Sequence, residues 1–296
     1  MMILTLYLHQ IDFRPTLKES SGISKLHFES IDDLQFGNKH IMSETIVFSG
    51  WIESQDDFRL PWQELQLISP FTNMTGLVYD PSELQSFTEA TNDFLGFDEI
   101  KRITMRMSDA CIGYGYANSV IWPDDFLRLA GDMNETWAVV LEKSEAAGKI
   151  LSEQVISKYI CGKRSITLTG FGAGAVVITS CLRQLVAMTE APDSNITGKC
   201  DNFGIIENVY IFGSPVPFES QELADIRSVV AGRFVNGYSA KDWMLALWQR
   251  NETRPIMGLG AIPSGLVENI DLSEIIVMHS SYKEMITEVM KRMFFE

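Results

Sequence analysis

The clearest indication of the fold is the segment ITLTGFGAGAVVITSCL, residues 166–182. It begins with a segment rich in β-branched residues, passes through glycines at positions 170, 172 and 174, and ends in an apolar segment. The first part is typical of a strand and the last part of a helix. Residues 165–182 carry no charge, but the glycines and the change of spacing favour a buried strand, turn and helix over a membrane span.

Short apolar runs that end in Gly, Ser, Asp or Pro recur along the chain. Such runs are buried on both faces, which is the pattern of a parallel sheet. Helix-length segments at 175–190 and 219–230 separate the last three runs. The resulting β-α-β-α-β alternation predicts an α/β fold, with a mostly parallel central sheet flanked by helices. The predicted strands are 45–51, 75–80, 165–171, 207–215 and 232–239.

The remaining segments are expected to complete a single domain over residues 1–296. Residues 1–44 contain the apolar runs MILTLYL and KLHFESI, which we expect to form N-terminal edge strands. Residues 81–160 carry helical signals, among them a Pro-Ser start, and predict a helical insertion before the strand at 165–171. The sequence has no repeat, low-complexity tract or flexible linker that would divide it.

Composition argues against several function classes. The formal net charge is −15, so neither nucleic acid nor an anionic membrane surface is an expected partner of this acidic, soluble protein. The four cysteines are far apart, without histidines at metal-ligand spacing, and we expect no metal, no other cofactor and no disulfide framework. The start of the sequence lacks the features of a signal peptide, which indicates a reducing, cytoplasmic location.

The glycine-rich bend has the frame of a nucleophile elbow. In α/β-hydrolases a strand leads into G-x-S-x-G, whose serine stands on a strained turn at the carboxyl edge of the sheet. Here GFGAG, residues 170–174, supplies the frame, with Gly172 at the position of the serine. Two other interpretations remain open. One is a dinucleotide-binding turn that would use Ala175 and Glu190, and the other is simple close packing of a helix on a sheet.

The order of residues after the bend bears on these interpretations. In an α/β-hydrolase the acid follows the nucleophile, and the histidine follows the acid. Asp242 lies beyond the second strand after the bend, and His279 is the only later histidine. They are the candidate catalytic acid and base, with the backbone N–H groups of Ala173 and of Trp51 or Ile52 as the oxyanion hole. The simpler alternatives are a helix N-cap for the aspartate and a structural role for the histidine.

Three hydroxyl groups are candidates for a substitute nucleophile. Thr169 lies within the strand before the bend, where a reacting hydroxyl would be poorly placed. Ser214 and Ser239 follow the next two strands, at the edge where ligands bind in open α/β sheets. Both serines are better explained as turn residues that satisfy nearby backbone groups.

Several stretches between Thr45 and the C-terminus resemble one family. They include SGWIES, TGFGAGAVVITSCL, IIENVYIFGSPVP, VVAGRFVNGYSAKDWMLALWQR and VENIDLSEIIVMHSSY, of which VNGYSxxDW is the most distinctive. The chain resembles the α/β-hydrolase-like family of transmembrane and coiled-coil domain-containing protein 4, also called domain of unknown function 726. The family elbow reads approximately G-[FY]-S-L-G-A-R-V-I. The resemblance places its serine on Gly172, the following leucine on Ala173, its acid on Asp242 and its histidine on His279.

The missing serine leads to two hypotheses about function. The first is a pseudoenzyme, a catalytically impaired module that binds a protein partner or an acyl, lipid-like ligand. The second is a serine-type lipase or esterase acting on acyl esters, with Gly172 as an introduced substitution or with a nucleophile supplied unconventionally. Family members usually carry membrane-associated stretches in the insertion, but charges interrupt that region here. Peripheral membrane association or a place in a larger assembly fits both hypotheses, and an integral membrane span is not expected.

Overall fold

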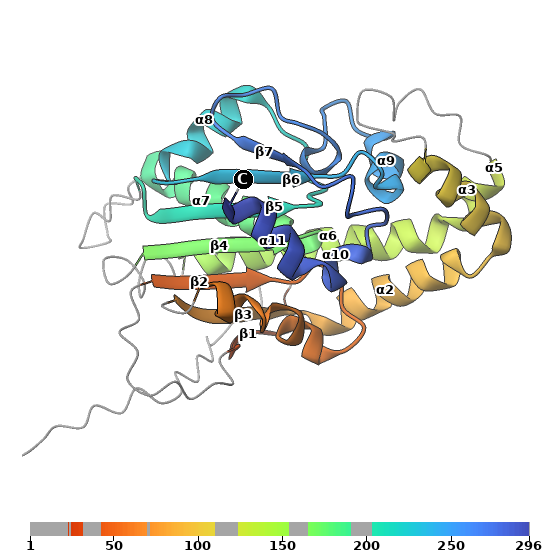
Figure 1. Ribbon diagram of the computed structural model, residues 1–296, viewed down its shortest axis with the longest axis horizontal. Coiled ribbons are helices and arrows are strands. Elements are labelled where there is room, and N and C mark those ends of the chain that lie inside the picture. Colours follow the sequence, from red (N-terminus) through yellow and green to blue (C-terminus); the bar gives the residue numbers. More distant parts are fainter. Residues whose placement is uncertain are drawn as a thin grey trace, which may run out of the picture.

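The computed structural model of the chain describes residues 23, 25–31, 43–69, 72–109, 124–153, 165–190 and 203–295. These residues build a seven-stranded sheet with helices on both faces (Figure 1). The strands are β1 (Leu26–Ser30), β2 (Ser43–Phe48), β3 (Thr72–Tyr79), β4 (Ser165–Phe171), β5 (Ile206–Phe212), β6 (Phe234–Tyr238) and β7 (Glu268–Asp271).

The sheet is mostly parallel, as the sequence predicts. Its strand order is β1-β3-β2-β4-β5-β6-β7. Only the edge strand β1 runs antiparallel to its neighbour, and every other pair is parallel. The KLHFESI run therefore forms an edge strand, whereas the MILTLYL run lies outside the described residues. β2 ends at Phe48, three residues before the predicted end, because the chain leaves the sheet at the Ser-Gly pair 49–50.

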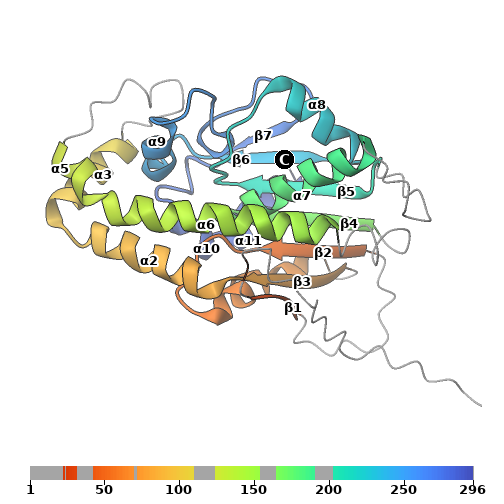
Figure 2. The same cartoon turned by 180° about the vertical axis from the view of Figure 1, so that it is seen from behind.

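Helices lie on both faces of the sheet and beyond one of its ends. Figure 1 shows α10 and α11 over one face, and Figure 2 shows α6, α7 and α8 over the other. α3, α5 and α9 lie beyond the carboxyl ends of the parallel strands, at the right of Figure 1. The helices are α1 (Leu65–Ile68), α2 (Pro81–Leu95), α3 (Asp98–Asp109), α5 (Asp124–Leu129), α6 (Gly131–Ile150), α7 (Ala173–Glu190), α8 (Ser220–Ser228), α9 (Trp243–Gln249), α10 (Ser281–Glu284) and α11 (Ile286–Phe295).

The uncharged stretch forms the centre of this arrangement, as β4 and α7. β4 lies between β2 and β5, and six of its seven residues are buried. α7 is buried over residues 173–182, and the Ser180 hydroxyl donates a hydrogen bond to the Glu145 carbonyl of α6 at 2.7 Å. A helix covered on two sides has no solvent face over this length, which explains why its sequence lacks charge. Among the described helices, none combines the length and the apolar character needed to cross a membrane.

Candidate active site

The bend between β4 and α7 is a tight turn centred on Gly172. Its φ is +54°, in the left-handed region that glycine adopts at little cost and other residues rarely adopt. The Gly172 N–H donates a hydrogen bond to the Phe212 carbonyl at 3.3 Å, and its carbonyl accepts one from the Ala175 N–H at 3.1 Å. These bonds join the turn to the neighbouring strand and to the first turn of α7. The sequence therefore has the strand, turn and helix that the elbow pattern predicts.

Asp242 and His279 form a buried hydrogen-bonded pair. Asp242 follows β6, and one of its carboxylate oxygens accepts a hydrogen bond from the Leu245 N–H at the start of α9, at 3.2 Å. The other oxygen lies 2.7 Å from His279 Nδ1. The two side chains are 0% and 2% exposed. The carboxylate favours the tautomer with the proton on Nδ1, which leaves Nε2 as the basic nitrogen.

The imidazole of His279 faces the elbow with this second nitrogen. A Cβ atom built on Gly172 would lie 3.0 Å from Nε2, so a serine hydroxyl at this position would be within hydrogen-bond reach of the ring. The structure thus brings together the three positions that the sequence singles out, although they belong to three separate segments. The N-cap interpretation of Asp242 holds as well, because each carboxylate oxygen has its own donor.

The loop after β2 packs directly on the elbow. A Cβ atom on Gly50 would lie only 2.4 Å from the Ala173 nitrogen, so the two backbones are in contact. The backbone N–H groups of Ala173 and Trp51 have no hydrogen-bond acceptor in the part of the chain that the structure describes. Buried N–H groups without an acceptor are rare, and the first N–H groups of a helix are available to an anion. This arrangement is chemically suited to hold a negatively charged oxygen.

Aromatic rings enclose the imidazole of His279. The ring centroids of Trp51, Trp248 and Tyr282 lie 6.4, 6.0 and 5.5 Å from it. Trp248, which belongs to the apolar segment after Asp242, is stacked on Trp137 of α6 at 4.2 Å. The segment Trp243–Trp248 is buried, and Trp248 also borders the histidine.

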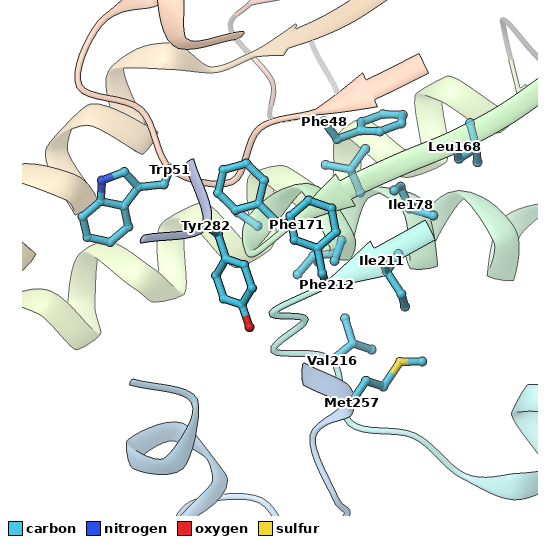
Figure 3. Packing of buried hydrophobic residues seen from close by; sticks show 14 of the residues in the cluster. Phe48, Trp51, Leu168, Phe171, Ile178, Ile211, Phe212, Val216, Met257 and Tyr282 are labelled. Atoms are coloured by element: carbon cyan, nitrogen blue, oxygen red, sulfur yellow. The ribbon is translucent and has the colours of Figure 1, made fainter. Parts of the chain in front are cut away.

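Tyr282 is a site neighbour that the sequence did not single out. Its ring packs against Phe171 and Phe212, which end the two central strands (Figure 3). Burial, and then the negative charge of Asp242, raise the pKa of Tyr282 well above its usual value, so the phenol keeps its proton at neutral pH. The only signal in the sequence was its position three residues after His279.

Each of the three alternative hydroxyls is in contact with another group of the protein. Thr169 Oγ1 lies 3.4 Å from the Met290 sulfur. Ser214 Oγ accepts a hydrogen bond from the Val216 N–H at 3.3 Å, and Ser239 Oγ donates one to the Ile276 carbonyl at 2.8 Å. All three hydroxyl-bearing residues are buried. Their contacts favour the structural interpretation of each.

A second network fixes the loop that carries Trp51. Lys283 Nζ lies 3.1 Å from Glu53 Oε2 and 3.3 Å from Asp57 Oδ2. That Asp57 oxygen also accepts a hydrogen bond from the Glu53 N–H at 2.7 Å. The network was not predicted, because its partners are 226 residues apart in the sequence. It ties the loop after β2 to the helix that follows His279.

The geometry gives little support to nucleotide or metal binding. α7 extends through Glu190, so this residue is not at the end of a second strand, where a dinucleotide site needs its acid. Over the described ranges, no three His, Cys, Asp or Glu side chains gather as metal ligands.

Comparison with known proteins identifies the family of the chain. The chain is 32% identical over 260 residues to "Probable lipase MIL1" of Saccharomyces cerevisiae, and 29% identical over 260 residues to "Transmembrane and coiled-coil domain-containing protein STS1" of Oryza sativa. Each alignment covers 86% of this chain, which spans only 23% of the yeast protein and 37% of the rice protein. No solved structure matches the chain. The family DUF726, described as "Protein of unknown function", matches residues 16–296, and the chain therefore belongs to this family.

Proposed function

We propose that this chain is an α/β-hydrolase-like pseudoenzyme, a binding module that has kept the Asp–His pair of a hydrolase and lost its nucleophile. One observation carries the proposal. The basic nitrogen of His279 faces Gly172, the position where a hydrolase presents its serine, and this residue has no side chain. A glycine cannot form an acyl-enzyme intermediate, because it has no atom that can attack a carbonyl carbon.

The surrounding fold supports a hydrolase ancestry. The turn joins a central parallel strand to a buried helix, and the acid and the histidine follow it in the order of that fold. The N–H groups of Ala173 and Trp51 correspond to the two oxyanion donors, one after the nucleophile and one from the loop of a neighbouring strand. Every part of an acyl-transfer site except the nucleophile thus has a counterpart here.

The parts that remain permit binding and at most slow chemistry. In a complete site the histidine would take the serine proton and later return it to the leaving group. Here His279 could act only on a water molecule or on a group of the ligand itself. Sites without the nucleophile still accelerate hydrolysis by about 10³–10⁴-fold over water, so the pseudoenzyme is defined by the absence of a covalent intermediate and of efficient turnover.

The second candidate function is hydrolysis of acyl esters by a lipase or esterase. The name of the yeast relative, "Probable lipase MIL1", favours this candidate. It requires a nucleophile other than Gly172, and Thr169, Ser214 and Ser239 all make contacts elsewhere. The first candidate is therefore the better supported.

A fluorophosphonate probe separates the two candidates, because it labels only an activated nucleophile. We expect no labelling of the native chain and no turnover of p-nitrophenyl esters. Gly172→Ser should gain labelling, and a second change, His279→Ala, should abolish it. Gly131→Ser is the matched control, since its side chain would meet nothing within 4 Å. Specific labelling of the native chain would refute the pseudoenzyme proposal.

A further inference from the structure

Hydrogen-bond donors without acceptors lie at the turn around Gly172 and on a ring beside the imidazole that faces it. The backbone N–H groups of Ala173 and Trp51 have no acceptor within the described segments. Among the described residues, the imidazole of His279 is hydrogen-bonded to Asp242 through Nδ1, and its other nitrogen faces the turn. Beside the imidazole, the buried indole N–H of Trp248 also lacks a partner among these residues. Because native structures seldom leave buried donors unpaired, we expect a ligand that offers oxygen acceptors.

We propose that this site binds the carboxyl group of an apolar monocarboxylic acid, such as a fatty acid. The inference rests on the proposed non-catalytic function and names the ligand class of the same site. One carboxyl oxygen would lie beside His279 Nε2, where a serine hydroxyl would otherwise stand. The second would accept hydrogen bonds from the N–H groups of Ala173 and Trp51. A carboxylate is the product of ester hydrolysis, so a site derived from a hydrolase has the donors to hold it.

The Asp–His pair distinguishes a carboxylic acid from an ester or an alcohol. An acid and the imidazole share one proton, either as a neutral acid that donates to Nε2 or as a carboxylate that accepts from a charged ring. Asp242 stabilises the charged ring from the opposite side, at 2.7 Å from Nδ1. An ester has no proton to share, and its alkoxy group adds bulk next to a turn where even a methyl group would approach Nε2 to 3.0 Å.

The surroundings of the imidazole favour an apolar remainder of the ligand. Trp51 and Trp248 border the ring, and Phe87 of α2 lies 5.7 and 6.2 Å from them between ring centroids. The positive end of the α7 dipole favours a negative group at the turn. The net charge of −15 opposes an anion at long range, but salt screens this repulsion beyond about 8 Å at physiological ionic strength.

Isothermal titration calorimetry can test the ligand class, with dodecanoate, methyl dodecanoate and dodecanol below their aggregation limits. We expect the native chain to bind dodecanoate at least about ten-fold more tightly than either neutral analogue, the effect of one charge-assisted hydrogen bond. His279→Ala should remove this preference. The control His27→Ala changes a half-buried histidine of β1 and should keep it.

A second variant that retains the histidine keeps the inference testable if His279→Ala fails to fold. Gly172→Ala adds a methyl group 3.0 Å from Nε2 and should weaken dodecanoate binding by about ten-fold. Equal affinity for acid and ester, no binding of the acid, or a preference that survives His279→Ala would each overturn the inference and leave the pseudoenzyme proposal intact. Efficient turnover of methyl dodecanoate would overturn the pseudoenzyme proposal itself, whichever ligand binds more tightly.

Discussion

Two adjacent strands of the sheet end in glycine turns that share a backbone conformation and differ in their surroundings. Gly172 after β4 has a φ of +54°, and Gly213 after β5 has a φ of +53°. A Cβ atom on Gly172 would approach the tip of the His279 ring at 3.0 Å. On Gly213 it would lie 2.4 Å from Cε2 and 2.7 Å from Cζ of Tyr282. The first turn faces one nitrogen of the imidazole at a tight contact distance, and the space beside the second is filled by the phenol ring.

The comparison separates two reasons for a glycine. The left-handed backbone disfavours any side chain at either turn, by about 1–2 kcal/mol. At Gly213 the Tyr282 ring adds a steric clash, so packing alone requires a glycine. At Gly172 a side chain would need only a small shift of His279. α/β-Hydrolases accept the backbone strain of such a turn in order to present a nucleophile. If the pseudoenzyme proposal is correct, this site has no such need, and glycine is the more stable residue there.

Gly213→Ala should produce the largest loss of stability. Overpacking against Tyr282 and the left-handed backbone together predict a loss of about 2–5 kcal/mol in the free energy of unfolding. Urea unfolding followed by circular dichroism measures it. Gly131→Ala is the control and should change stability by less than about 0.5 kcal/mol, since nothing lies within 4 Å of its added methyl group. A loss below 1 kcal/mol for Gly213→Ala would mean that the Tyr282 ring is not held in place.

Asp242→Ala should have the next largest effect, because Asp242 fixes the side chain that faces Gly172. The variant leaves the buried Nδ1–H of His279 without an acceptor and removes the N-cap of α9. We expect a loss of about 2–3 kcal/mol in unfolding free energy. Asp242→Asn keeps a side-chain acceptor for the Leu245 N–H and should recover about 1 kcal/mol. Equal losses for the two variants would show that the cap contributes nothing.

The elbow and the order of its partners could be predicted from the sequence because both depend on local patterns. Around residues 170–174 the sequence changes from a segment rich in β-branched residues to apolar residues at helical spacing, which identifies the strand and the helix. The chain order of the catalytic residues in α/β-hydrolases then singles out Asp242 and His279. β7 was missed, since four residues with mixed polarity and no buried member carry no strand signal. α11 was also missed, although its sequence carries a usable helix signal. Apolar residues recur there at helical spacing, and all of them are buried: Ile286, Val289, Met290 and Met293.

The surroundings of the site could not be predicted, because they depend on segments that meet only in the folded chain. Tyr282 matters because its ring fills the turn at Gly213, and Lys283 because it reaches a loop more than 220 residues earlier. Neither residue stands in a recognisable motif. Spacing along one chain does not indicate which of several late side chains faces a given strand end.

Gly172→Ala should reduce the free energy of unfolding by less than Gly213→Ala does. The added methyl group requires only the left-handed backbone and a displacement of His279 by a few tenths of an ångström. We therefore expect a loss of about 1–2 kcal/mol in the free energy of unfolding. Parallel urea titrations of the two variants give the difference directly. Equal losses would contradict the distinction between the two turns and would mean that the imidazole is packed as rigidly as the phenol.

Lys283→Met should have the smallest effect, and it tests whether the two turns share a support. Lys283 lies next to Tyr282, four residues after His279, and its ammonium group pairs with Glu53 and Asp57. A partly exposed pair of this kind contributes about 0.5–1 kcal/mol. The exposed pair Lys291–Glu288 offers the control, and Lys291→Met should cost less than about 0.3 kcal/mol.

The contribution of Lys283 should depend on pH in a defined direction. Burial by itself would lower the pKa of Lys283, but the hydrogen bonds and charges of Glu53 and Asp57 outweigh it and raise the pKa. A raised lysine pKa stabilises the fold fully below the unfolded value, about 10.4, and this stabilisation is lost as the pH rises through the folded value. The difference in unfolding free energy between the native chain and Lys283→Met should therefore be constant from pH 7 to 9 and shrink above pH 10.4.

If Lys283 supports both turns equally, the difference in unfolding free energy between Gly172→Ala and Gly213→Ala will be the same in the Lys283→Met background. A narrower gap would mean that the tether holds the Tyr282 ring against Gly213 more than it holds His279 against Gly172.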